Sequence, residues 1–266
     1  MKLLTVSIVI HELDEKLFRS VLMSLASTVQ QAGMADDILV VLVDNGCNQP
    51  RLEPLLEDIT NPGFTTTILQ QAENRGFGAG HNAALKAYPG RFHLILNPDV
   101  LLGEDTISLA MKHFETHEDT VLICPHGCDE KGRPAFLSKR YPALVTLAAR
   151  AFGTSWWISK ANARYEYHDL PVNEPAEVEL ASGCCMFARG DALRSVEGFN
   201  EQYFLYFEDF DLSLRLATLG KVMHLPRMTI THYGGEAARK GLRHWLYFCR
   251  SGIRFFNAHG WKLFQY

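Results

Sequence analysis

The 266-residue sequence lacks any uncharged apolar run approaching the ~20 residues that a membrane-spanning helix needs. It also lacks the charged and then apolar leader that directs secretion, because Leu3 and Leu4 run straight into a strand-like pattern. We therefore expect a protein that is made and kept in the cytoplasm. Peripheral contact with the inner face of the cell membrane stays open.

Cysteine pairs at metal-binding or redox spacing are missing as well. The six cysteines lie at positions 47, 124, 128, 184, 185 and 249 without a C-x-x-C pair, and a chain of this size does not need disulfides. We expect reduced thiols. Cys124, His126 and Cys128 resemble half of a zinc site, but a second ligand pair is missing, so packing at a strand end is favoured over zinc.

The sequence has no excess of positive charge either. Its formal net charge is -4 and its pI is near 6.3, so nucleic acid is not an expected partner. Internal repeats and low-complexity tracts are absent from the sequence. With 47% apolar and 21% charged residues, we expect one large domain, with or without an appendage.

Strand and helix patterns alternate through the first 100 residues. The predicted strands are 3–10, 36–46, 64–71 and 91–100, and the predicted helices are 14–33, 51–59 and 79–88. This alternation is typical of a parallel sheet with helices on both faces. Ligands of such sheets bind outside the carboxyl ends of the strands, where Asp44, the segment 74–82 and Asp99 follow.

The pattern is looser beyond residue 120. It predicts a strand at 121–125, a strand followed by the start of a helix within 178–193, an amphipathic helix at 207–220 that ends at Gly220, and one or two strands within 222–235. The stretch 126–179 shows no sustained period. Such stretches in compact domains are usually lids or binding loops.

Three glycines at alternate positions, Gly76, Gly78 and Gly80, precede the predicted helix at 79–88. Glycines let backbone amides approach an anion, and a helix amino terminus favours negative charge, so this loop suits a phosphate. An ordinary turn is the alternative. The spacing differs from G-x-G-x-x-G and the loop follows the third strand, which disfavours a dehydrogenase.

Carboxylates and one histidine are the candidate catalytic groups. Asp99 ends a strand after Asn97 and Pro98 and could ligate Mg²⁺ or Mn²⁺, with a turn or helix cap as the alternative. His232 could complete the ligand shell or be a structural histidine. Glu208, Asp209 and Asp211 exceed what helix capping needs, and one could deprotonate an acceptor hydroxyl.

Taken in order, seven segments resemble the motifs of glycosyltransferase family 2, in particular its bacterial rhamnosyltransferase-like branch. They are VSIVI, LVDNG, NRGFGAGHNAAL, LILNPDV, ASGCCMFARGDAL, GFNEQYFLYFEDFDLSLRLATLG and ITHYGG, and the resemblance covers about residues 4–256. It implies an α/β GT-A fold with a Rossmann-like, mostly parallel central sheet and a C-terminal helical appendage.

The resemblance also implies an activity, an inverting transfer of a sugar from a nucleotide diphosphate. L-rhamnose from dTDP-rhamnose is the favoured donor, and UDP-linked donors stay open. The implied acceptor is a saccharide or lipid-linked saccharide of a bacterial cell-surface polysaccharide, such as O-antigen, lipopolysaccharide or capsule.

Roles for single residues follow from the resemblance. Asp44 would bind the nucleotide base, and the residues beside the ribose and diphosphate would be Asn74, Arg75, Gly76 and Gly78. The D-x-D-like element would consist of Asn97 and Asp99, and Asp99 would bind Mn²⁺ or Mg²⁺ together with His232. Asp209 would be the catalytic base. Three places depart from the family pattern. They are Asn97 in place of a carboxylate, Ile10-His11-Glu12 in place of a Tyr-Asn pair, and Gly234-Gly235-Glu236-Ala237 in place of a serine-containing ending.

We predict a catalytic domain over residues 1–238, with a nucleotide-sugar-binding half at 1–120 and an acceptor-binding half at 121–238. A basic and aromatic helical segment follows at 239–266. This segment could lie in a membrane interface, or pack on the catalytic domain or on the second subunit of a homodimer, and packing is slightly favoured. Arg140, Trp156, Trp157 and Tyr165 lie where this fold shapes its acceptor cleft, although ordinary loop packing is favoured for each.

Two other functional classes stay open. A sugar-nucleotide-binding protein without catalysis is disfavoured by Asp99 and Asp209. A nucleotidyltransferase would carry a glycine-rich basic loop after the first strand, where this chain has the net negative segment HELDEK.

Overall fold

The computed structural model describes residues 2–46, 48–58, 63–147, 156–234 and 242–263. Cys47, the segment 235–241 and residues 264–266 lie outside the described residues, as do the side chains of Trp156 and Trp157. Across the described ranges, no helix combines the length and apolar character needed to cross a bilayer.

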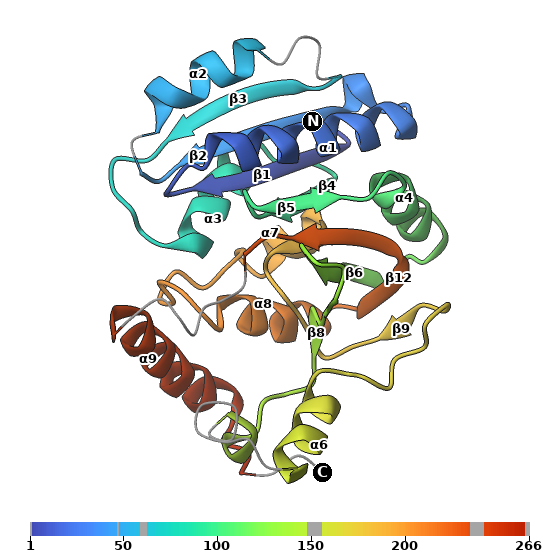
Figure 1. Ribbon diagram of the computed structural model, residues 1–266, viewed down its shortest axis with the longest axis vertical. Helices are drawn as coiled ribbons and strands as arrows, with labels where there is room; N and C mark the ends of the chain where they lie inside the picture. The colour runs from blue at the N-terminus through green and yellow to red at the C-terminus, as the bar shows by residue number, and fades with distance from the viewer. Residues whose placement is uncertain (1, 47, 59–62, 148–155, 235–241, 264–266) are drawn as a thin grey trace.

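Strands and helices alternate along the first half of the chain, as predicted (Figure 1). The strands are β1 Leu4–Ile10, β2 Ile38–Asp44, β3 Thr65–Gln70, β4 Phe92–Leu96, β5 Val100–Leu102, β6 Thr120–Asp129, β7 Pro134–Ala135, β8 Ser138–Lys139, β9 Ala176–Glu177, β10 Leu180–Ala181, β11 Cys185–Arg189 and β12 Lys221–His232. The helices are α1 Glu15–Ala32, α2 Gln49–Asp58, α3 Phe77–Ala87, α4 Thr106–Thr116, α6 Trp156–Tyr165, α7 Gly190–Ser195, α8 Glu208–Ala217 and α9 Leu242–His259, with a short 3₁₀ turn η1 at Ala35–Asp37.

Both halves of the chain contribute strands to one central sheet. Its order is β3-β2-β1-β4-β11-β6-β12-β5, with β7 on β6 and β9 on β12. The pairs β3-β2, β2-β1 and β1-β4 are parallel, whereas β11 runs antiparallel to both β4 and β6. The α/β class is confirmed, and antiparallel pairing enters the sheet at β11. The predicted functional division at residue 120 stays a prediction, because the sheet runs through it.

Helix α1 shows how the sequence sets the ends and the buried face of an element. Asp14 caps its start by accepting a hydrogen bond from the Leu17 amide at 3.0 Å, and Gly33 ends it in the left-handed conformation at φ 65. Its buried side chains Phe18, Val21, Leu22, Leu25 and Val29 belong to the same core cluster as the side chains of β1 and β2. Each such burial contributes about 1.5–3 kcal/mol.

Some elements were not predicted. Helix α4 has buried residues at helical spacing, at Ile107, Ala110, Met111 and Phe114, so its pattern was present in the sequence. Strand β5 has three residues and is defined by its antiparallel pairing with the distant β12, which local patterns do not reveal. The stretch 126–179 contains the short strands β7, β8 and β9 and helix α6, rather than only loop.

The carboxyl ends of the parallel strands meet at one edge of the sheet. Ile10 at the end of β1 pairs with Asp44 at the end of β2, and Ile8 pairs with Leu96 at the end of β4. Figure 1 shows the arrowheads of β1 and β3 at the left of the view, on the same side as the start of α3 and helix α9. The predicted ligand-binding edge therefore exists in the structure.

A buried polar group lies between β1, β4 and α3. The Ser7 hydroxyl is 2.6 Å from His81 Nδ1 and 2.8 Å from His93 Nε2, and both imidazoles are 1% exposed. Burial, with a smaller contribution from Arg194, lowers the pKa of His93 to about 4. Burial and the neighbouring His93 also lower the pKa of His81. Both histidines are therefore neutral in the folded protein at neutral pH.

The lowered pKa values of these two histidines imply that the free energy of unfolding depends on pH. Unfolded histidine titrates near 6.5, so below that pH the unfolded state binds more protons and the folded state loses stability as pH falls towards 4. We expect His93 alone to lower the free energy of unfolding by about 2 kcal/mol at pH 5 relative to pH 7.5, measured by urea denaturation. The H93Q variant should show a shallower decline, and equal declines for both proteins would contradict the assignment.

Candidate active site

A cleft of about 860 Å³ lies at the carboxyl ends of β1 and β2. The strand ends, the loop before α3, the segment before α8 and the first turns of α9 form its walls. Its lining residues are Val9, His11, Glu12, Asn45, Asn74, Gly76, Phe77, Phe204, Leu205, Arg243, His244 and Tyr247. The cleft is at the edge where the sequence predicts a ligand.

The loop before α3 is fixed by two asparagines. Asn74 Oδ1 accepts a hydrogen bond from the Gly76 amide at 2.9 Å, and Asn45 Nδ2 donates to the Gly76 carbonyl at 3.1 Å. Gly76 has φ +101, and a Cβ there would lie 2.4 Å from the carbonyl oxygen of Phe204. Only glycine fits at this position, which brings the backbone of the loop against the cleft.

The other two glycines of the loop serve packing. Gly78 and Gly80 lie inside α3, where added Cβ atoms would come within 2.7 Å of Phe199 and 2.8 Å of Val9. The structure therefore explains Gly78 by close contact of α3 with its neighbours. Its predicted place beside a diphosphate stays a prediction.

Asp44 and Arg75 lie apart from the walls of the cleft. Asp44 is fully buried and its carboxylate accepts hydrogen bonds from the Gly46 amide, the Gln49 amide and the Asn48 side chain at 2.7–3.1 Å. Burial acts to raise the pKa of Asp44, but these hydrogen bonds outweigh it and lower the pKa. Arg75 pairs with Glu201 at 2.6 Å and lines a separate surface cleft. Their nucleotide contacts stay predictions.

Asp99, in the turn between β4 and β5, and His232, at the end of β12, are brought together as predicted. Asp99 Oδ1 lies 3.4 Å from His232 Nε2, yet this oxygen and Asn97 Oδ1 are both buried without a hydrogen-bond partner. Burial acts to raise the pKa of Asp99, but His232, the Asp99 backbone amide and the Asn97 side chain together outweigh it and lower the pKa. The carboxylate is thus held ionised beside an imidazole.

This group of atoms fits a divalent cation. A carboxylate oxygen, an amide oxygen and an imidazole nitrogen are accepted ligand types, and buried oxygens without donors call for a partner. A Cβ at Gly234 would lie 2.0 Å from Asp99 Oδ2 and 3.2 Å from His232 Nε2, so glycine keeps the space beside both groups open. Among the described residues no cluster of three histidine, cysteine or acidic side chains is present, so substrate and water oxygens would complete the shell.

Glu208 and Asp209 begin α8 and differ in their surroundings. Glu208 is 5% exposed, and one of its carboxyl oxygens has no hydrogen-bond partner. Burial, reinforced by the neighbouring Asp209, raises the pKa of Glu208 well above its usual range. Burial also raises the pKa of Asp209, but amides of Gly183 and Phe210 donate to its carboxylate at 2.9 Å and oppose the shift. Asp209 is therefore the member of the pair that ionises.

The turn Gly183-Cys184 connects the cation site, Asp209 and the cleft. The Asn97 amide donates to the Cys184 carbonyl at 2.9 Å, and the Gly183 amide donates to Asp209. Burial raises the pKa of the Cys184 thiol to about 12, and the charges of Asp99 and Asp209 both add to the shift. A Cβ on Gly183 would touch both Asp209 and the Phe77 ring at 3.2 Å. Asp99 and Asp209 thus flank one turn, next to a wall of the cleft.

Helix α9 supplies three cleft residues that the sequence analysis did not identify. Arg243, His244 and Tyr247 lie on its first turns, and the Tyr206 hydroxyl and His244 Nδ1 are 2.9 Å apart. The basic and aromatic composition of the tail was visible in the sequence. The place of α9 in the fold depends on contacts between residues about 40 positions apart in the chain, such as Tyr206 and His244, and composition does not reveal such contacts.

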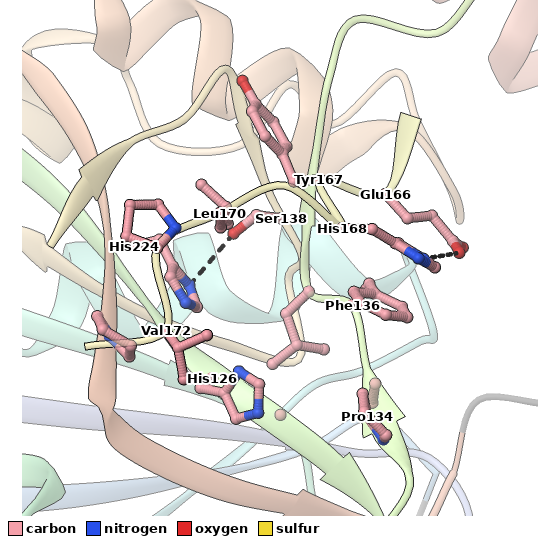
Figure 2. A pocket seen from close by; sticks show the side chains of 15 residues that line it. His126, Pro134, Phe136, Ser138, Glu166, Tyr167, His168, Leu170, Val172 and His224 are labelled. Carbon is pink, nitrogen blue, oxygen red and sulfur yellow. Dashed lines mark hydrogen bonds and ion pairs between the residues drawn. The ribbon is translucent and has the colours of Figure 1, made fainter. Parts of the chain in front are cut away.

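A second cavity, of about 260 Å³, lies between β6, β8, β12 and the segment after α6 (Figure 2). His126 and His224 line it, and dashed lines in Figure 2 mark the interactions of Ser138 with His224 and of Glu166 with His168. Burial lowers the pKa of His224 to about 4. This cavity contains none of the predicted site residues, so the strand-end cleft is the candidate active site.

The predicted acceptor residues are explained by packing where their side chains are described. Arg140 forms two hydrogen bonds to the Asp169 carboxylate at 2.9 and 2.7 Å, and its guanidinium lies 3.9 Å from the centre of the Tyr167 ring. Tyr165 is 4% exposed. Ordinary loop packing, the favoured alternative for both, accounts for these positions.

Comparison with known proteins decides the family. Residues 7–196 match the family described as Glycosyl transferase family 2. The chain belongs to this family. It is 25% identical over 211 residues to the N-acetylglucosaminyl-diphospho-decaprenol L-rhamnosyltransferase of Mycobacterium tuberculosis, a match over 74% of this chain and 66% of that protein. It is 26% identical over 167 residues to the rhamnosyltransferase WbbL of Escherichia coli, over 59% of this chain and 61% of that protein.

Solved structures confirm the GT-A fold for this family member. The mannosyltransferase PcManGT from Pyrobaculum calidifontis, in complex with GDP-Man and Mn²⁺, aligns with TM-score 0.63 at 15% identity over 96% of this chain and 63% of that one. S. aureus TarS in complex with UDP-GlcNAc aligns with TM-score 0.61 at 17% identity over 97% and 67%. The fold prediction made from sequence is therefore correct.

The position of Gly76 gives a test of the cleft. A G76A variant should lose at least about tenfold in affinity for dTDP or UDP, measured by titration calorimetry, because the added Cβ collides with the Phe204 carbonyl at the cleft wall. The matched control is G132A, which also has a positive φ, +74, but meets nothing within 4 Å. Equal nucleotide affinities of the two variants would separate Gly76 from the binding site.

Proposed function

We propose that this family 2 member is an inverting glycosyltransferase that moves a sugar from a nucleoside diphosphate to an acceptor hydroxyl. The observation that supports this most is the Gly183-Cys184 turn, which the carboxylates Asp99 and Asp209 flank beside the cleft wall at Phe77. A leaving-group site and a proton acceptor are needed close together for such a transfer. The same arrangement favours catalysis over a protein that only binds sugar nucleotides.

Asp209 is the proposed general base. It takes the proton from the acceptor hydroxyl as that oxygen forms a bond to the anomeric carbon. The bond from the anomeric carbon to the diphosphate oxygen breaks on the opposite face, and the nucleoside diphosphate leaves with the electron pair. The raised pKa of the Asp209 carboxylate strengthens it as a base, and Glu208 beside it keeps its own proton.

Asp99, His232 and Asn97 are proposed to hold Mn²⁺ or Mg²⁺. The cation, when bound, neutralises charge on the diphosphate. A cation held by few side chains takes its other ligands from substrate phosphates and water, which agrees with the ligand set of this site. Two structures with this fold, that of PcManGT and that of GalNAc-T7, contain Mn²⁺.

L-rhamnose from dTDP-rhamnose is the proposed donor, and a UDP-linked sugar is the alternative. Two relatives are named rhamnosyltransferases, and the mycobacterial one is named for a lipid-linked saccharide acceptor. We propose a saccharide or lipid-linked saccharide acceptor in cell-surface polysaccharide biosynthesis, with the enzyme acting at the cytoplasmic face of the membrane. The matches cover about two thirds of the relatives' lengths, so these substrates are assigned as a proposal.

The D209N variant tests the base. It should fold, bind dTDP with wild-type affinity and lose about 10²–10⁴-fold in kcat for transfer, because the amide does not accept the proton. D105N is the matched control, since Asp105 is exposed and its side chain makes no capping hydrogen bond. Transfer at the wild-type rate by D209N would exclude Asp209 as the base.

Removal of the cation tests the second part of the site. Exhaustive chelation with EDTA should abolish transfer, and Mn²⁺ or Mg²⁺ should restore it in the wild type. D99N should require a Mn²⁺ concentration at least about tenfold higher for half-maximal transfer, because the neutral amide is a weaker ligand. Full activity after chelation would remove Asp99 and His232 from this role.

A further inference from the structure

Large exposed apolar side chains gather at the end of the chain. Among the described residues, eleven such side chains are exposed, and six of them lie between positions 245 and 263. They are Trp245, Leu246, Phe248, Ile253, Trp261 and Leu263, with exposures of 39–60%. Val145 joins them, because its amide donates to the Leu263 carbonyl at 3.2 Å. A gathering of this kind marks an interaction site.

Helix α9 has two apolar faces, and among the described residues only the inner one is buried against other parts of the chain. Phe255 and Phe256 on the inner face are buried in a cluster with Tyr141, Tyr203 and Phe207. Leu246 and Ile253 are seven residues apart, close to two full helical turns, so they lie on one stripe, and the exposed Trp245 lies beside it. Figure 1 shows α9 at the lower left margin of the molecule.

The outer face is held in a defined orientation. His259 at the end of α9 lies 2.8 Å from the Asp211 carboxylate, and Ser251 in its middle donates to the Leu205 carbonyl at 2.8 Å. These contacts attach α9 to α8 and to the segment before it. The outward position of Trp245 and Ile253 is therefore built into the fold.

The charge of this region is opposite to that of the remaining chain. Residues 237–266 contain six lysines and arginines and no acidic residue, whereas residues 1–236 carry a net excess of ten acidic residues. On α9, Arg243 and Arg250 are exposed, and the helical angle puts both on the flank of the apolar stripe. Tryptophan, aliphatic side chains and flanking arginines are the composition of helices that lie in the interface of an anionic membrane.

We propose that the outer face of α9, together with Trp261 and Leu263 just after the helix, docks the protein on an anionic lipid bilayer. The apolar stripe enters the boundary between headgroups and acyl chains, and the arginines contact the lipid phosphates. A two-fold contact between copies is disfavoured, because it would place like charges from both copies side by side.

Docking by this face brings the cleft to the membrane. Arg243, His244 and Tyr247 line the cleft from the first turns of the same helix, so the cleft lies at the end of the docked surface. A lipid-linked acceptor would then reach the site without leaving the bilayer. This last step rests on the proposed function, whereas the docking itself rests on α9 alone.

Vesicle flotation of the full chain tests the proposal. The wild type should float with vesicles of phosphatidylglycerol and phosphatidylcholine, and far less with phosphatidylcholine alone. The double variant W245S/I253S should lose at least about tenfold in membrane partitioning, because it removes the apolar side chains that enter the bilayer. R250E should reduce binding to the anionic vesicles only, and high salt should have the same effect.

The matched control is V172S/L219S, which removes two exposed apolar side chains, 83% and 50% exposed, from elsewhere on the surface. It should float as the wild type does. No flotation of the wild type, or equal loss in the control, would overturn the proposal. A concentration-dependent dimer that W245S/I253S abolishes would assign the face to a second copy instead.

Binding of dTDP to W245S/I253S separates this proposal from the proposed function. Unchanged nucleotide binding with lost flotation supports docking by α9 independently of catalysis. Flotation without nucleotide binding or transfer by the wild type would leave the docking surface in place and refute the glycosyltransferase assignment.

Discussion

The hydrogen bond from the Gly183 amide to the Asp209 carboxylate joins two segments that are 26 residues apart in the chain. Gly183 precedes β11, the strand that enters between β4 and β6, so its position is fixed by the central sheet. Asp209 begins α8, which packs under the same sheet. Because the bond connects the sheet to the helix, it sets the distance between Asp209, the proposed proton acceptor, and the strand ends where the donor is proposed to bind.

The same turn limits which residues can stand there. A side chain on Gly183 would press against both Asp209 and Phe77, and the buried Cys184 beside it keeps its proton because burial and two nearby carboxylates oppose ionisation. The site therefore combines two ionised carboxylates with a neutral thiol and the neutral Glu208.

The sequence predicts the first half of the fold well, because β1, β2 and β4 are short apolar runs and α1 has caps at both ends. It predicts the second half less well. Strands β5 and β9 have three and two residues and are defined by pairing with β12, which lies far away in the chain. Pairing between distant segments depends on tertiary contacts, which local periodicity does not contain.

The candidate site shows the same division. The pairing of Asp99 with His232 was predicted from residue types at strand ends, and the structure brings them within 3.4 Å. The family resemblance implies that Arg75 and Gly78 lie beside the ribose and diphosphate. In the structure Arg75 pairs with Glu201, and Gly78 lies inside α3, which begins at Phe77, two residues before the predicted helix start at 79. Their contacts with the diphosphate stay predictions.

Tyr206 and Phe207, immediately before Glu208, have φ angles of 71 and 65, a conformation that costs a residue with a Cβ about 1–2 kcal/mol. Glycine would adopt it freely, but the Phe207 ring packs 5.1 Å from Phe248 and 5.3 Å from Phe255 of α9. Aromatic packing against α9 therefore offsets a conformation that the backbone alone disfavours. A chain shortened before α9 would lose this compensation, and the segment carrying Asp209 would relax away from the cleft. The C-terminal helix is thus part of what shapes the candidate active site, and we expect that it does not transfer as a separable module between proteins.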